Sequence, residues 1–102
     1  MGGTPSVAEV LEQAADRLSK PGQWGQGSGP CKGQHCADTM IYTVAYDREL
    51  REKSRKFFAK HIGGATHFDT YRWNDAKGRT QEEVVAKLRE AADLARAEQV
   101  QA

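Results

Sequence analysis

The feature that most constrains this chain is a set of apolar residues repeated at helical spacing. Between Ser6 and Lys20, such residues recur three or four positions apart and so share one face of a helix: Val7, Val10, Leu11, Ala14, Ala15 and Leu18. Ser6 and Glu9 form a capping-box pair before this stripe, and Lys20-Pro21-Gly22 ends it because proline disfavours a helical residue before it. We therefore predict a helix over residues 7–19.

Two further segments carry the same signals. Asp47 suits an N-cap and Gly63-Gly64 suits a helix end, and the stripe between them comprises Leu50, Ser54, Phe57, Phe58, His61 and Ile62. Thr80 and Glu83 form another capping box, and the stripe that follows comprises Val84, Val85, Leu88, Ala91, Ala92 and Ala95. These patterns predict helices over residues 47–62 and 81–99.

The rest of the chain is less regular. Residues 36–46 fit a helix that buries Met40, Ile41 and Val44, but they also fit a strand in which β-branched and aromatic residues alternate. Residues 21–35 and 65–79 show neither period, and we predict both to be irregular. A strand over 39–46 could pair with 66–72, which would make a small α+β fold instead of an all-α one.

Composition limits the size of the core and the class of protein. The chain has 102 residues, enough for a single domain over 1–102, and we expect its ends at 1–5 and 100–102 to be flexible. Fourteen of the hydrophobic residues are alanine, so the core is thin and the segments that carry Trp24 and Trp73 must pack onto the helices. A formal net charge of +1, two cysteines and no long apolar run argue against membrane insertion and secretion and favour the cytoplasm.

Three short motifs resemble those of a known family. Trp24-Gly25-Gln26-Gly27 follows the first helix, Cys36-Ala37 opens the middle segment, and Trp73-Asn74-Asp75 with Gly78-Arg79-Thr80 precedes the last helix. Together they resemble a family of small uncharacterised proteins from actinobacteria and their bacteriophages, classed as a domain of unknown function. The resemblance covers residues 7–96, implies a helical fold and supplies no activity.

The resemblance favours helix for residues 36–46. We therefore predict an all-α domain of four helices, at 7–19, 36–46, 47–62 and 81–99, with two tryptophan-anchored loops. The chain departs from the family in two places, since its middle helix carries Tyr42, Thr43 and Tyr46 and its third helix is unusually basic.

Cysteine and histidine offer the weakest candidates for chemistry. Cys31, His35 and Cys36 are soft metal ligands, but their spacing lies outside the usual zinc patterns, so we expect no metal and no cofactor. As a thiol enzyme, the chain would use Cys36 as the nucleophile, and the candidate bases and orienting carboxylates would be His61, His67, Asp69 and Asp75. No specific motif surrounds Cys36, so an enzyme is the less favoured reading.

Two other groups are candidates for binding. Trp24, Trp73, Asn74 and Asp75 would anchor loops and form a turn, or else form a recognition surface. Arg51, Arg55, Lys56 and Lys60 lie off the apolar stripe of the third helix, either as a solvated face or as a small nucleic-acid footprint. Our leading prediction is a non-enzymatic accessory protein that engages a bacterial protein, with a homodimer as a further option and a nucleic-acid-binding module or a Cys36-centred protein as the alternatives.

Overall fold

The fold is all-α, as predicted. We analysed a computed structural model of the chain, which describes residues 6–27 and 34–101. Within those ranges the chain forms five helices: α1 (Val7–Leu18), α2 (Ala37–Val44), α3 (Arg48–His61), α4 (His67–Asn74) and α5 (Gln81–Gln101). None of them is both long and apolar enough to cross a membrane.

Local capping explains where the helices begin. Ser6 and Glu9 exchange hydrogen bonds at the start of α1, and Thr80 and Glu83 do the same before α5. The Asp47 carboxylate accepts the Leu50 N–H at the start of α3. Each cap satisfies backbone N–H groups that lack a partner inside the helix, so these starts follow directly from the sequence.

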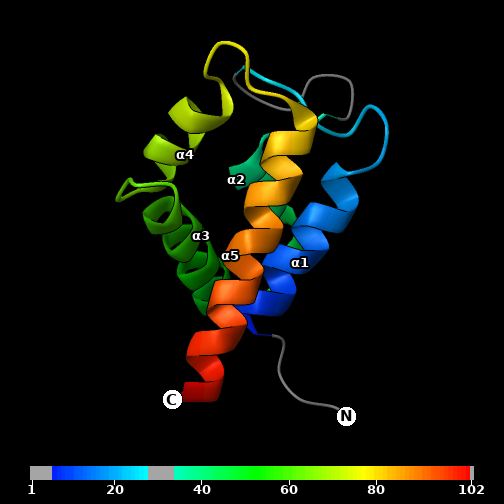
Figure 1. Cartoon of the computed structure of the whole chain (residues 1–102). Helices are drawn as coiled ribbons and strands as arrows, with labels where there is room; N and C mark the ends of the chain where they lie inside the picture. The colour runs from blue at the N-terminus through cyan, green and yellow to red at the C-terminus, as the bar shows by residue number, and fades with distance from the viewer. Residues whose placement is uncertain (1–5, 28–33, 102) are drawn as a thin grey trace.

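The helices pack around one core. Figure 1 shows α1 and α5 side by side and antiparallel, with α3 and α4 on the other side of α5 and α2 behind. The buried apolar side chains are small or aliphatic except for Phe58, and Trp24 and Trp73 pack against them from the edge. The largest of these core residues are Leu11, Leu18, Met40, Ile41, Phe58, Val84 and Leu88.

The prediction that residues 65–79 are irregular is wrong, because these residues contain α4. This helix buries only two side chains, Thr70 and Asn74, and both are polar. It therefore has no apolar stripe to reveal it, although the Thr66–Asp69 capping box that starts it is visible in the sequence. Trp73 consequently lies in the last turn of a helix and not in a loop.

The alternative hairpin is also wrong. Residues 37–44 form a helix, and the described residues contain no strand, only a single bridge between Trp24 and His35. Flexible ends were predicted at 1–5 and 100–102. Residues 1–5 and 102 lie outside the described residues, and residues 100 and 101 belong to α5.

Candidate functional site

A buried polar junction joins the segment around Trp24 to the end of α4. Asn74 is fully buried, and its Oδ1 accepts hydrogen bonds from Trp24 Nε1 at 2.7 Å and from the Ala37 N–H at 3.0 Å. Its Nδ2 donates to the Gly25 carbonyl and to Asp75 Oδ1, each at 3.1 Å. The Asn74 amide thus makes two accepted and two donated bonds, which is its full capacity, and all of them go to groups of this chain.

The neighbouring polar groups extend this junction. Asp75 Oδ1 also accepts the Gly27 N–H at 3.0 Å, and Gln26 Nε2 donates to the Asn74 and Ala76 carbonyls. Three of the four candidate binding residues, Trp24, Asn74 and Asp75, therefore lie together and hold the first irregular segment against α4.

Trp73, the fourth candidate, is half-buried between an aromatic ring and a cation. Its ring meets the edge of Phe58 at a centroid distance of 5.6 Å. The Arg79 guanidinium lies 4.3 Å from the Trp73 ring centroid, and Arg79 Nε donates to the Trp73 carbonyl at 2.9 Å. These contacts hold Trp73 as a packing residue between α3 and the turn that leads to α5.

The candidate thiol chemistry is dispersed. Cys36 is the N-cap of α2, and its buried sulfur accepts the Thr39 N–H at 3.4 Å. His61 instead meets Glu90 of α5 at 2.7 Å, while the His67 ring packs against its aromatic neighbours on α4. Cys31 lies outside the described residues, and within 6–27 and 34–101 no three His, Cys, Asp or Glu side chains come together as a metal site.

The chain itself engages Arg51 and Arg55, the two arginines among the predicted nucleic-acid contacts. Arg55 makes a bidentate ion pair with buried Asp38, with Nε–Oδ1 and Nη2–Oδ2 distances of 3.0 and 2.8 Å. The hydrogen bonds that Arg55 donates to Asp38, together with the negative charge of Asp38, raise the pKa of the Arg55 guanidinium. Arg51 donates from Nε to the Ala45 carbonyl at 3.0 Å. Of the predicted nucleic-acid residues, only Lys56 and Lys60 are exposed, and neither has a carboxylate at ion-pair distance among the described residues.

A group of exposed aromatic side chains lies beside these arginines. Tyr42 on α2 is 48% exposed, and the Arg51 and Arg55 guanidinium carbons lie 4.0 and 5.4 Å from its ring centroid. On α4, Phe68 is 57% exposed, and its ring centroid lies 6.0 Å from that of Tyr71. Burial, followed by the charge of Asp38, raises the pKa of the Tyr71 phenol.

Two clusters of side chains from three helices, joined where Arg55 and His67 line one hollow, form a surface that we call the aromatic–arginine face. It comprises Tyr42, Arg51, Arg55, His67, Phe68 and Tyr71. Beside it lies a hollow of about 260 Å³, lined by Glu52, Arg55, Lys56, Ala65, Thr66 and His67. Sequence reasoning missed this face because α4 was not recognised, although Tyr42 lies off the predicted apolar stripe of its helix.

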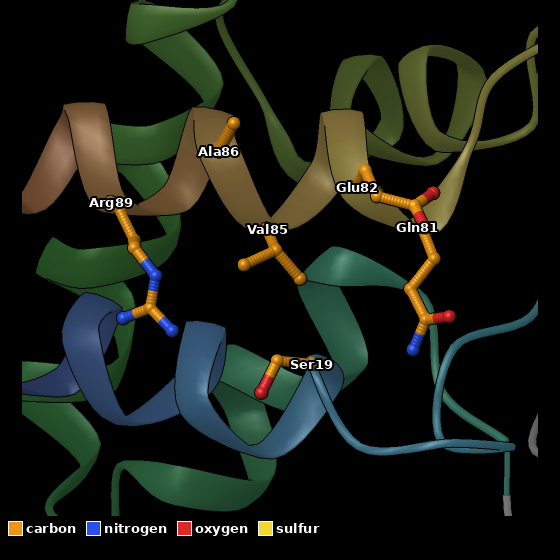
Figure 2. A pocket seen from close by; sticks show the side chains of 6 residues that line it. All are labelled: Ser19, Gln81, Glu82, Val85, Ala86 and Arg89. Carbon is orange, nitrogen blue, oxygen red and sulfur yellow. The ribbon is translucent and has the colours of Figure 1, made fainter.

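A second hollow lies between the end of α1 and the first half of α5. Figure 2 shows the Arg89, Val85 and Gln81 side chains projecting from α5 toward α1, with Ser19 opposite them. Its volume is about 320 Å³. Its polar groups are already engaged, since Arg89 pairs with Glu12 and Asp16, and Gln81 donates to the Leu18 and Lys20 carbonyls at the end of α1. This hollow therefore belongs to the α1–α5 packing.

Comparison with the profiles of known protein families identifies the family of this chain. The profile of a family of unknown function, DUF6197, matches residues 3–94. The chain belongs to the DUF6197 family. The match covers all of α1 to α4 and most of α5, and it confirms the expectation of an uncharacterised domain family. No curated protein and no solved structure matches this DUF6197 chain.

Proposed function

We propose that the chain is a small non-enzymatic binding protein that engages a bacterial protein through the aromatic–arginine face. The observation that carries the proposal is the exposure of Phe68 and Tyr42, at 57% and 48%, in a chain with so few large apolar residues. A thin core gains stability from every aromatic ring it buries, so rings left outside it are available for an interface.

The chemistry of the face supports a protein partner. Tyrosine and arginine are enriched at the energetic centres of protein–protein interfaces, because each combines a large contact area with directional hydrogen bonding. Here the rings and guanidinium groups already touch one another on helices, so little side-chain freedom remains to be lost on binding. The face is therefore preorganised.

The non-enzymatic part of the proposal rests on how the reactive groups are used. The Cys36 sulfur caps α2, His61 meets Glu90, and Asn74 has no free polar atom. In this proposal Trp24, Asn74 and Asp75 act indirectly, by fixing the end of the helix that presents Phe68 and Tyr71. The cytoplasm of an actinobacterium, with a bacterial or phage gene, is the setting that the family resemblance suggests.

Site-specific photo-crosslinking tests the proposal. A benzophenone amino acid replaces Tyr42 in one variant and Phe68 in a second, and in a control it replaces Gln13, an exposed residue of α1. We expect the first two variants to form a covalent adduct with the same protein in actinobacterial lysate, and the Gln13 variant to form none. Equal adducts from all three positions, or none from positions 42 and 68, would overturn the proposal. An adduct that nuclease treatment removes would favour the nucleic-acid module instead.

A further inference from the structure

On the aromatic–arginine face, more positively charged than negatively charged groups lack a partner within the described part of the chain. The carboxylates around it all have partners in this chain: Asp38 and Glu52 pair with Arg55, and Asp47 caps α3. Asp69 accepts the Ala65 and Thr66 N–H groups at 2.7 and 3.1 Å, and it also pairs with Arg72. These bonds lower the pKa of Asp69, with the two backbone N–H groups as the main cause, so it stays ionised and engaged.

Arg51 is held in an orientation suited to an anion. Its guanidinium carbon lies 4.0 Å from the Tyr42 ring centroid, and its Nε donates to the Ala45 carbonyl. The two terminal nitrogens make no hydrogen bond within the described part of the chain. A guanidinium that packs against a ring in this way keeps its terminal donors for a carboxylate, which it binds through two parallel hydrogen bonds.

Lys56 provides a second cation beside the neighbouring hollow. It is exposed and lines the hollow of about 260 Å³ together with His67 and Thr66. Lys56 lies five residues after Arg51 on α3, a rise of about 7.5 Å along the helix axis and a turn of about 140° around it. A partner segment that binds both cations therefore has to follow the surface of α3, from the Tyr42 ring at Arg51 to the hollow beside Lys56.

We infer that the partner of this face is an acidic protein segment, in which Asp or Glu side chains flank apolar ones. Its carboxylates bind the terminal nitrogens of Arg51 and the ammonium group of Lys56, and its apolar side chains pack on Tyr42 and Phe68. This inference rests on the proposed function and adds the chemistry of the partner. Charge complementarity of this kind sets specificity and the rate of association.

An array of random-sequence synthetic peptides tests the inference. The peptides that bind the full chain should be enriched in Asp and Glu next to Leu or aromatic residues. For the best binder, Arg51→Gln should weaken the affinity about tenfold, because a charge-assisted bidentate pair is lost. Lys56→Gln should weaken it about threefold, as expected for an exposed pair, and added salt should weaken it further.

The matched control is Lys20→Gln, which removes one exposed positive charge at the far end of α1. It should leave the affinity unchanged. Lys56 is exposed and makes no side-chain hydrogen bond or ion pair within the described part of the chain, so its variant remains informative even if Arg51→Gln unfolds. Bound peptides without an excess of acidic residues, or equal effects of Lys56→Gln and Lys20→Gln, would overturn the inference. If the peptide test fails but the photo-crosslinks from positions 42 and 68 still form in lysate, only the acidic chemistry of the partner is wrong. If those crosslinks do not form either, the proposed function is wrong as well.

Discussion

Trp24 donates its indole N–H to the buried amide oxygen of Asn74 at 2.7 Å, across fifty positions of sequence. The same oxygen accepts the first N–H of α2, from Ala37. One side chain thus links the irregular segment after α1, the start of α2 and the end of α4. The position of α4, and with it that of Phe68 and Tyr71, depends on this link.

Replacing Asn74 should destabilise the fold strongly. Asn74→Ala leaves the Trp24 indole N–H, the Ala37 N–H and the Gly25 carbonyl without their partner, and unsatisfied buried groups of this kind are costly. We expect the free energy of unfolding to fall by about 2–4 kcal/mol in urea titrations. Gln13→Ala, on the exposed face of α1, should change it by less than about 0.5 kcal/mol. A loss below about 1 kcal/mol for Asn74→Ala would contradict a central role for this junction.

The Asp38–Arg55 pair should behave as one unit. Asp38 is 1% exposed and the Arg55 side chain 12%, so removing one partner leaves the other charge buried and uncompensated. We expect Asp38→Ala to cost about 3–5 kcal/mol, and the double variant with Arg55→Met to cost less than the two single changes added together. Urea unfolding of the four proteins in this cycle gives the coupling energy. Strictly additive effects would show that the pair does not act as a unit.

Tyr71 should make stability depend on alkaline pH. Burial, followed by the charge of Asp38, raises the pKa of its phenol in the folded protein above the ordinary value. The folded state then holds the Tyr71 proton at a pH where the unfolded chain has lost it, so stability falls as the pH rises above about 10. The difference between the absorbance titrations of the parent chain and of Tyr71→Phe isolates the Tyr71 phenol. This phenol should lose its proton at a higher pH than a free tyrosine does. The decline in stability above pH 10 should be shallower in that variant, and an unchanged slope would rule out this linkage.

Phe58 of α3 and Phe68 of α4 should differ strongly in how much their replacement changes stability. Phe68 is 57% exposed, so Phe68→Ser should change the free energy of unfolding by less than about 1 kcal/mol. Phe58 is fully buried and meets the Trp73 ring, so Phe58→Ser should cost about 3–5 kcal/mol. Thermal and urea unfolding provide the comparison. Phe68→Ser should also abolish the crosslink from position 42, and retention of that crosslink in a folded variant would exclude Phe68 from the binding surface.

Most of the fold could be predicted from local signals. The helices around Leu11, Phe58 and Leu88 were found within a few residues of their ends, because each combines a capping residue with an apolar stripe. Helix α4 could not be found in this way. It buries Thr70 and Asn74, so its contribution to packing leaves no apolar periodicity in the sequence.

The candidate site could be predicted only in part. The tryptophan–asparagine–aspartate motif is visible in the sequence, and its polar pair suits a turn. The hydrogen bond between Trp24 and Asn74 could not be predicted, because it joins residues fifty positions apart. Arg51 and Arg55 were identified as basic residues on the helix. Tyr42 contacts Arg51, and Asp38 pairs with Arg55. Both contacts depend on how α2 packs on α3.

Local sequence signals are sufficient to start helices at Ser6, Asp47 and Thr80, since a cap and the first turn that it stabilises lie within four residues of each other. The composition of the sequence also determines that the core is small. The packing of the helices on one another selects which aromatic rings remain outside that core and which charged groups have no partner among the described residues. The exposure of Phe68, and the terminal nitrogens of Arg51 that bond to none of the described residues, result from contacts between α2, α3 and α4. Such contacts join residues whose spacing in the sequence carries no periodic signal.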